Sequence, residues 1–149
     1  MRILLIGYSG CGKTSAADFI ATKTGGKVAN ESDYIIASYA QHMGLDKDWV
    51  KENKYDLRDA LFTHARAQQK IDPTYPVKLA LDDGATIITG TRNPDELAAK
   101  REMYDIVVWV ARPGYEAGPT DKLKPEDADV VISATNLKEL EQEVEKLLA

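Results

Sequence analysis

The sequence contains a single cysteine, Cys11, among 149 residues. One cysteine excludes an internal disulfide and a metal cage built from several cysteines. No apolar run approaches the roughly 20 residues that a membrane-spanning helix needs, and the first apolar run is too short for a signal peptide. We therefore expect a cytoplasmic protein with no membrane partner.

Positive charge is also scarce, because 24 acidic and 19 basic residues give a formal net charge of −5. This balance argues against broad electrostatic attraction to nucleic acid or to anionic lipid, so any anion site needs cations gathered locally. Repeats and low-complexity segments are absent. With 44% hydrophobic and 29% charged residues, the chain is typical of one globular domain over residues 1–149.

The most informative segment is GYSGCGKT, residues 7–14, which directly follows an apolar run and precedes helix-compatible sequence. It fits the phosphate-loop pattern G-x-x-x-x-G-K-[ST] in the strand–loop–helix context that this pattern requires. The glycines let successive N–H groups approach an anion, and the following helix points its N-terminus at the same place. Lys13 is expected to reach the β- and γ-phosphates of ATP, and Thr14 to offer its hydroxyl to Mg²⁺. The candidate nucleotide-binding residues are Gly7, Ser9, Gly10, Cys11, Gly12, Lys13, Thr14 and Ser15.

Short apolar segments alternate with helical patterns along the chain. Strands are expected at 2–6, 27–30, 85–90, 106–110 and 130–132, and helices at about 12–23, 34–43 and 46–70, near 73, from 93 and from 136. This alternation predicts a parallel, doubly wound α/β sheet of about five strands with helices on both faces, and the phosphate loop makes it a fold of the P-loop NTPase type. Residues 34–83 are interpreted as a helical insertion and residues 112–126 as a short lid loop. Both tryptophans, Trp49 and Trp109, are expected in the core, and the isolated His42 and His64 are interpreted as structural.

A phosphate loop alone does not distinguish GTPases, motor ATPases and small-molecule kinases. The string Asn53-Lys54-Tyr55-Asp56 matches a guanine-reading motif, but it lies in a helical stretch before the third strand. No apolar strand ends in Asp-Glu, as an AAA-type ATPase requires, since the segment at 85–90 ends in Thr89-Gly90. A kinase of small substrates therefore remains.

The arginines support a kinase, because phosphoryl transfer relies on fixed cations that neutralise the transferred group. Arg92 and Arg112 follow the third and fourth strands, at the edge where ligands bind in open α/β sheets. Arg58 and Arg66 lie about two turns apart on the inserted helices, where a solvated helix face is the alternative. Asp33 is a candidate to take a proton from the acceptor, to orient it or to hold the water shell of a metal; its alternative role is a helix N-cap.

Several segments together resemble the phage-type deoxynucleoside monophosphate kinases of the P-loop kinase superfamily. These segments are GYSGCGKT, LRDALF, IDPTYPVKLAL, IITGTRNPDEL, VARPG and DADVVISATNLKELEQEV. The resemblance implies an adenylate-kinase-like fold that transfers the γ-phosphoryl group of ATP to a deoxynucleoside 5′-monophosphate. It also implies that Lys13 and Thr14 hold ATP and Mg²⁺, that Arg58 and Arg92 hold the acceptor phosphate, and that Arg112 contacts the donor. The candidate catalytic residues are Lys13, Asp33, Arg92 and Arg112, and the candidate substrate-binding residues are Asp33, Arg58, Arg66 and Arg92.

The chain also departs from that family. Gly90 stands where the family usually has an acidic residue, which shifts the support of Mg²⁺ to Asp33 or Glu31, and the lid offers Lys122 and Lys124 in place of arginines. The segment VANESDYII resembles the acidic motif of shikimate-kinase-like enzymes. Two alternatives therefore stay open: phosphorylation of a hydroxyl on a small metabolite or a hydroxymethylated DNA base, and a nucleotide-binding module without turnover. A homodimer is also left open.

Overall fold

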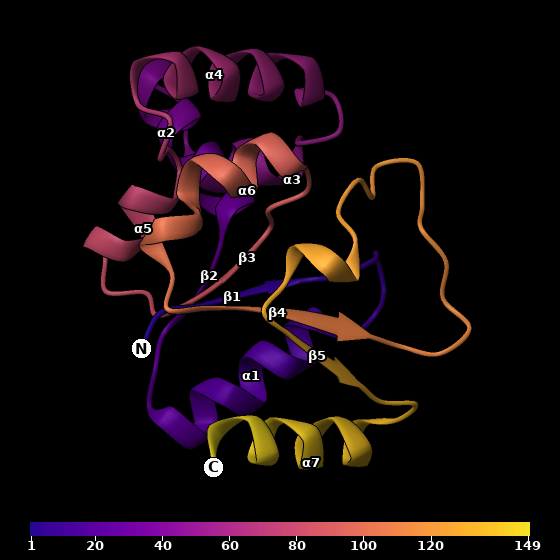
Figure 1. Cartoon of the computed structure of the whole chain (residues 1–149). Coiled ribbons are helices and arrows are strands. Elements are labelled where there is room, and N and C mark those ends of the chain that lie inside the picture. Colours follow the sequence, from indigo (N-terminus) through magenta and orange to yellow (C-terminus); the bar gives the residue numbers. More distant parts are fainter.

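The computed structural model describes residues 1–149 and contains one sheet of five parallel strands (Figure 1). The strands are β1 (Ile3–Ile6), β2 (Val28–Asn30), β3 (Ile87–Thr89), β4 (Ile106–Ala111) and β5 (Val130–Ser133), in the spatial order β2-β3-β1-β4-β5. β1 is central and buried along its whole length, and Leu4 is paired with Ile88 on one side and Val107 on the other. The predicted parallel α/β fold is confirmed.

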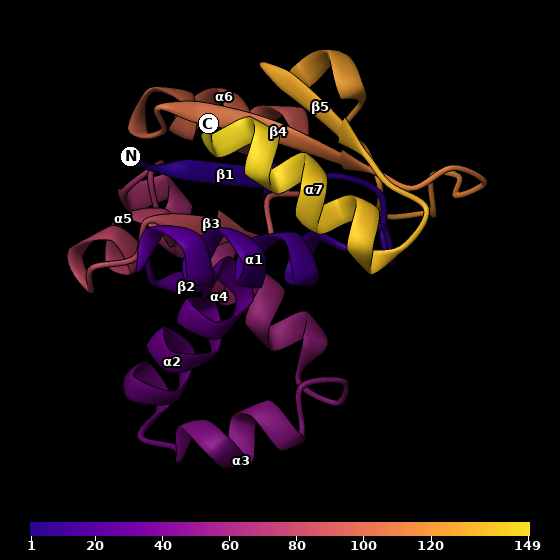
Figure 2. The ribbon, with the colours of Figure 1, turned by 90° about the horizontal axis from the view of Figure 1, so that it is seen from below.

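Helices cover both faces of this sheet (Figures 1 and 2). α1 (Lys13–Thr24) and α7 (Leu137–Leu148) cover one face, and α5 (Val77–Asp82) and α6 (Pro94–Lys100) cover the other. Successive residues of β1 point to opposite faces, so Ile3 and Leu5 pack on the α1/α7 side and Leu4 and Ile6 on the α5/α6 side. The unbroken apolar character of this strand follows from its burial on both faces.

The other three helices, like α5, come between β2 and β3 in the sequence. They are α2 (Glu31–Met43), α3 (Lys47–Glu52) and α4 (Arg58–Ile71), and they form a separate small core around Ile36, Tyr39, Ala40 and Val50. The single helix expected at 46–70 is wrong, because the N–H and side-chain amide of Asn53 both donate to the carbonyl of Trp49 and end α3. Trp49 is 47% exposed, so its predicted core position is also wrong, whereas Trp109 is 2% exposed as predicted.

The helix-start signals read from the sequence are confirmed at two places. Asn93 accepts from the Glu96 N–H at 2.9 Å, and Asn136 accepts from the Glu139 N–H at 2.9 Å. α2 differs, because its N-cap is Asn30, which accepts from the Ser32 N–H at 2.9 Å. Asp33 therefore lies in the first turn of α2 and is not the cap, and its carboxylate is free of a capping role.

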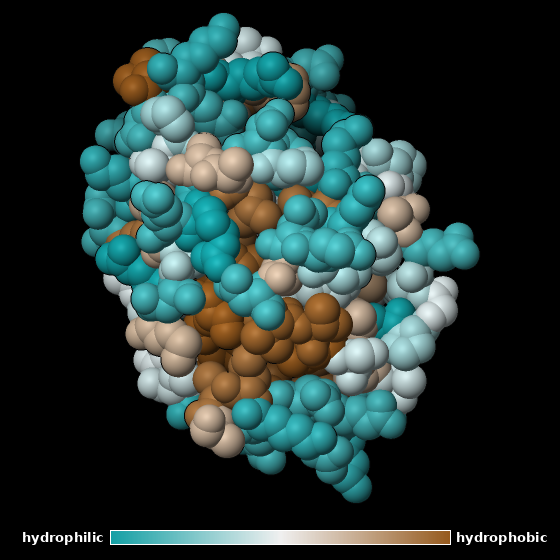
Figure 3. All heavy atoms as spheres, in the orientation of Figure 1, coloured by the Kyte–Doolittle hydropathy of each residue, from teal (hydrophilic) through white to brown (hydrophobic).

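Polar side chains cover most of the face shown in Figure 3, and an apolar patch lies low on it over β4 and β5. β5 is an edge strand, and Val131 on it is 52% exposed. No helix is both long and apolar enough to cross a lipid bilayer.

His64 of α4 packs against α2 and is 9% exposed. Its Nε2 lies 2.8 Å from the Ser38 hydroxyl, and the His42 ring is 5.6 Å away, so the two histidines are not isolated from one another as expected. Burial lowers the pKa of His64 below its usual value of 6.5, and the neighbouring His42 lowers it further. The folded state therefore favours the neutral imidazole.

This shift makes stability depend on pH. Above pH 6.5 the imidazole is neutral in both the folded and unfolded states, whereas below it the unfolded chain takes up a proton that the folded chain resists. We expect the free energy of unfolding to fall as the pH drops from about 6.5 to 5, a range in which most carboxylates remain ionised. Urea titrations should show a smaller fall for His64→Gln than for the natural protein; equal falls would contradict this.

Candidate functional site

The loop between β1 and α1 lies at the carboxyl edge of the sheet, as the sequence predicts. At Gly7 a Cβ would lie 2.5 Å from the Val110 carbonyl oxygen, so only glycine lets the loop pass β4 this closely. Gly12 is the N-cap of α1 with φ of 95°, in the left-handed region that favours glycine. These two glycines give the loop its path from the strand into the helix.

The Lys13 side chain reaches back over the phosphate loop, which precedes it in the sequence. Its Nζ donates to the carbonyls of Gly7 at 2.7 Å and Tyr8 at 3.1 Å. Partial burial lowers the pKa of Lys13 and the nearby charge of Arg92 lowers it further, while Asp121 raises it. The ammonium group is thus held at the mouth of the loop by groups that an anionic ligand can replace.

A carboxylate from the lid loop also contacts the phosphate loop. Asp121 accepts from the Ser9 N–H and hydroxyl, both at 3.2 Å, and from the Gly118 N–H at 2.8 Å. Partial burial alone would raise the pKa of Asp121, but these hydrogen bonds and the charge of Lys13 together lower it. An ionised side chain therefore accepts a hydrogen bond from an N–H group of the anion-binding loop. The sequence did not reveal this contact, because the two residues are 112 positions apart.

We expect Asp121→Asn to bind ATP more tightly than the natural protein, because the neutral amide no longer competes with phosphate for Ser9 and Lys13. The gain should be about three- to tenfold in Kd, the equivalent of one hydrogen bond. Calorimetric titration with ATP measures it, with the lid variant Glu126→Gln as the control. Weaker binding by Asp121→Asn would show that the carboxylate supports the loop.

The phosphate loop borders a small cavity of about 210 Å³, which we call the phosphate cavity. Its cations are Lys13, Arg92 and Lys122, and its only carboxylate is that of Asp121. The cavity is therefore positive within a chain of net negative charge, which is the local focus that the sequence requires. The other lining residues are Gly7, Ser9, Gly10, Thr14, Asn30, Thr89, Gly90, Thr91 and Leu123.

One larger cleft, about 770 Å³, continues from the phosphate cavity and shares Gly90, Arg92 and Lys122 with it. We call it the arginine cleft. It lies between the start of α2, the exposed face of α4 and the start of α6, and it includes Arg66, whose guanidinium stacks 5.0 Å from the Phe62 ring centre. Two arginines from distant segments thus face one space, next to the phosphate loop.

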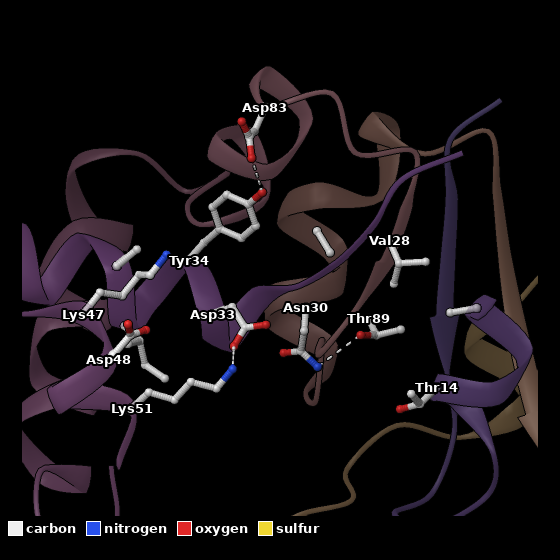
Figure 4. A pocket seen from close by; sticks show the side chains of 14 residues that line it. Thr14, Val28, Asn30, Asp33, Tyr34, Lys47, Asp48, Lys51, Asp83 and Thr89 are labelled. Atoms are coloured by element: carbon white, nitrogen blue, oxygen red, sulfur yellow. Dashed lines mark hydrogen bonds and ion pairs between the residues drawn. The ribbon is translucent and has the colours of Figure 1, made fainter. Parts of the chain in front are cut away.

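A second cleft, about 640 Å³, leaves the phosphate cavity on the opposite side of α2 and shares Thr14, Asn30 and Thr89 with it (Figure 4). We call it the α3 cleft. Asp33 lies 3.6 Å from the Lys51 ammonium, and the Tyr34 hydroxyl donates to Asp83 at 2.7 Å. Burial, followed by this hydrogen bond, raises the pKa of Tyr34 to about 12.

The structure does not bring the predicted acceptor residues together. Arg66 and Arg92 line the arginine cleft, whereas Asp33 lines the α3 cleft. Arg58 begins α4, is exposed and lines neither cleft, since eight helical residues place it about 12 Å along the axis from Arg66. The sequence spacing predicted one face but could not show that the cleft covers only one end of the helix.

Arg112 follows β4, and its guanidinium stacks 4.9 Å from the Tyr115 ring centre. A Cβ on Gly10 would lie 3.2 Å from that ring, so Tyr115 covers the phosphate loop. The sequence does not reveal the role of Tyr115, because a tyrosine in a Gly/Pro-containing loop carries no signal of its own. Arg112 and Tyr115 together present a planar surface beside Gly10.

Gly90 and Glu31 bear on which residue could support Mg²⁺. Gly90 has φ of 113°, and a Cβ there would lie 3.1 Å from the backbone nitrogen of Glu31, so an acidic residue at this position would be strained. The Glu31 carboxylate is enclosed and bonded to Lys100 and Thr91. Glu31 is therefore not free to hold the water shell of a metal at Thr14, and Asp33 is the remaining candidate.

No group of three or more His, Cys, Asp or Glu side chains is arranged to hold a metal ion. Thr14 and Asp33 nevertheless line the same α3 cleft, and the Asp33 side chain is 54% exposed. Mg²⁺ commonly uses one or two protein oxygens together with waters and substrate phosphates. The hydroxyl and the carboxylate fit that donor set.

A model of the family described as "ATPase family associated with various cellular activities (AAA)" matches residues 3–145. This match overturns the expectation that the absence of Asp-Glu after β3 excludes the AAA class. A search of the curated proteins gave no match.

Solved structures with similar folds include several kinases. The structure of TT1252 from Thermus thermophilus superposes with a TM-score of 0.63 at 13% identity, covering 99% of this chain and 95% of that one. Shikimate kinase from Acinetobacter baumannii in complex with shikimate gives 0.55 at 16% identity, with coverage of 99% and 92%. The APS kinase of Mycobacterium tuberculosis gives 0.51 at 18% identity, with coverage of 99% and 96%. The fold is the parallel α/β fold that these structures share, and the narrower resemblance to phage-type deoxynucleoside monophosphate kinases stays a prediction.

Proposed function

Since the chain belongs to the ATPase family associated with various cellular activities and folds like P-loop kinases, we propose that it is an ATP-dependent kinase. Its acceptor is a (deoxy)nucleoside 5′-monophosphate. The supporting observation is that the phosphate cavity continues into the arginine cleft through two shared cations, Arg92 and Lys122. This arrangement suits two anionic groups that must meet despite their mutual repulsion.

The donor occupies the phosphate loop in this proposal. Backbone N–H groups of the loop and Lys13 bind the β- and γ-phosphates, and Lys13 exchanges its bonds to the Gly7 and Tyr8 carbonyls for phosphate oxygens. Arg112 and Tyr115 lie beside Gly10, where they can contact the nucleoside part of ATP. Mg²⁺, held by the Thr14 hydroxyl and through water by Asp33, would neutralise charge on the phosphates when bound.

The acceptor occupies the arginine cleft. An oxygen of its phosphate attacks the γ-phosphorus of ATP and forms a new P–O bond, while the bond to the β,γ-bridging oxygen breaks and its electron pair leaves on ADP. Arg92, which lines both spaces, neutralises the group in transfer, and Arg66 holds the acceptor phosphate. Asp121 moves off Ser9 when the triphosphate binds.

The α3 cleft supports a second candidate function, phosphorylation of a hydroxyl on a small metabolite. Asp33 is an exposed carboxylate that shares this cleft with Thr14 of the phosphate loop, so it can accept the proton of a hydroxyl held there. The structures of similar fold include kinases named for shikimate, a sugar and APS. The two candidates therefore differ in which side of α2 receives the acceptor.

Measurement of ADP release with the four deoxynucleoside monophosphates, and separately with shikimate and sugars, tests both candidates. We expect activity with a monophosphate, an increase in its KM of about tenfold or more in Arg66→Ala, and little change in the matched control Arg58→Ala on the same helix. Activity with a hydroxyl acceptor, lost in Asp33→Asn and kept in Arg66→Ala, would establish the second function. Tight ATP binding without turnover on any acceptor would indicate a nucleotide-binding module.

A further inference from the structure

One ion pair in this protein differs from all the others. The Lys100 ammonium lies 2.8 Å from the Glu31 carboxylate, and the two side chains are 1% and 5% exposed. In every other ion pair both side chains are at least 30% exposed. Desolvation of two charges is costly, and an apolar pair of similar volume is often as stable. The burial of this pair therefore calls for a role other than stability.

The contacts of the pair lead towards the site. Lys100 bonds one carboxylate oxygen of Glu31, and the hydroxyl of buried Thr91 donates to the other oxygen. The Tyr104 ring is also buried close by, and burial followed by the charge of Glu31 raises the pKa of its phenol well above the usual range. Both oxygens of the carboxylate are thus engaged by buried side chains.

The pair joins the start of α2 and the end of α6 to residues 89–91, which line the phosphate cavity. Glu31 is the first residue of α2, Lys100 is the last residue of α6, and Thr91 immediately precedes Arg92. Two further contacts run alongside. The Asn30 amide donates to the Thr89 hydroxyl at 3.1 Å, and Gly90 lies against the backbone nitrogen of Glu31. Residues 89–91 are consequently held against residues 30–31 along their whole length.

Arg92 depends on this support. Its side chain is exposed and forms no ion pair within the protein, so its own contacts do not fix where the guanidinium lies. The backbone on its N-terminal side is the part that is anchored, through the side chain of Thr91. A cation that must face both the phosphate cavity and the arginine cleft needs a backbone that is held in one place.

We propose that the Glu31–Lys100 pair is a positioning element, which holds Thr91 and so sets the place of Arg92 between the two spaces. Its kinetic consequence rests on the kinase function proposed above. Glu31 lines the arginine cleft, but both of its carboxylate oxygens are engaged by Lys100 and Thr91, so in this account the pair acts through Thr91.

The decisive variant is Glu31→Gln/Lys100→Met, which removes both charges and leaves no buried charge without a partner. We expect it to melt close to the natural protein, with an unchanged KM for ATP and a KM for the deoxynucleoside monophosphate raised about tenfold. The control is Lys23→Met/Glu145→Gln, which removes an exposed pair of 2.9 Å and should change neither constant. Natural values of both constants in the buried-pair variant would overturn the proposal.

Thr91 provides a test that does not require the double variant to fold. Thr91→Val removes the hydroxyl that binds Glu31 and should raise the same KM, whereas Thr91→Ser keeps a hydroxyl and should restore it. A purely structural role for the pair would lower the melting temperature without separating the two KM values. Equal KM values in Thr91→Val and Thr91→Ser would also reject the proposal.

A third readout is independent of turnover. We expect the ¹⁵N order parameter of the Arg92 backbone amide to be about 0.85 in the natural protein and to fall below about 0.7 in Thr91→Val. If no acceptor is phosphorylated, the proposed function fails while this measurement still tests the pair. An unchanged order parameter in Thr91→Val rejects the positioning role, whatever the reaction.

Discussion

Lys13→Met is expected to lower kcat/KM for phosphoryl transfer by about 10²–10³-fold or more, because one fixed cation at a developing anionic centre is worth that much. Methionine keeps an unbranched stem of similar length, so packing beside the loop is retained. The bonds from Nζ to Gly7 and Tyr8 are lost, which costs about 1–3 kcal/mol each for a charged donor. The fold should therefore survive while the activity does not.

The matched control is Lys23→Met, a lysine of the same helix α1 that pairs with Glu145 on the surface. It removes the same charge without touching the phosphate cavity, and we expect natural turnover. Single-turnover kinetics with ATP and the best acceptor measure both variants. Natural turnover in Lys13→Met would show that the phosphate loop binds its ligand without the lysine.

Arg92→Ala is expected to raise the KM of the acceptor or to lower kcat by about 10²-fold, with little change in the KM for ATP. The reason is its position, since Arg92 lines both the phosphate cavity and the arginine cleft and has no other partner in the protein. Arg92→Lys should recover only part of the loss, because an ammonium cannot form the two parallel bonds of a guanidinium.

Steady-state kinetics with each substrate varied in turn separate these effects. A change confined to ATP affinity would mean that the two substrate sites have been assigned in reverse. The pH should be held near 7.5, where His64 is neutral.

The parts of the fold that the sequence predicted correctly are those set by local chemistry. Asn93, Pro94 and Glu96 lie within four residues at one helix start. An apolar run such as Ile3 to Ile6 is buried when helices cover both faces of a parallel sheet. The phosphate loop belongs to the same class, because its glycines and Lys13 act on atoms a few residues away.

The site beyond the loop depended on distant contacts. Asp33 and Arg66 come from neighbouring helices, but the sequence could not tell that α2 separates them into two clefts. The Glu31–Lys100 pair spans 69 residues, and nothing in either residue type signals that both are buried. Trp49 is the opposite case, a residue expected in the core that is exposed. The short helix α3 buries only one side, and Val50 lies on that side.

The absence of an acidic residue at position 90 follows from the local backbone geometry. The left-handed backbone at this residue and the close approach of Glu31 leave no room for an acidic side chain. The carboxylate at the start of the neighbouring helix is instead turned inward to Lys100. In the proposed function, metal support would therefore come from Asp33, on a different element from the one that the resemblance suggests.

Cys11 lies within the phosphate loop and is only 5% exposed, with its N–H donating to the Tyr8 carbonyl at 3.2 Å. A thiol reagent can reach the sulfur only when the loop opens, and the chain has no other cysteine to react. Alkylation of this one thiol can therefore be used to follow opening of the loop in the natural protein. The rate of alkylation counts openings of the nucleotide-binding loop, and its slowing by added nucleotide would report occupancy without any label.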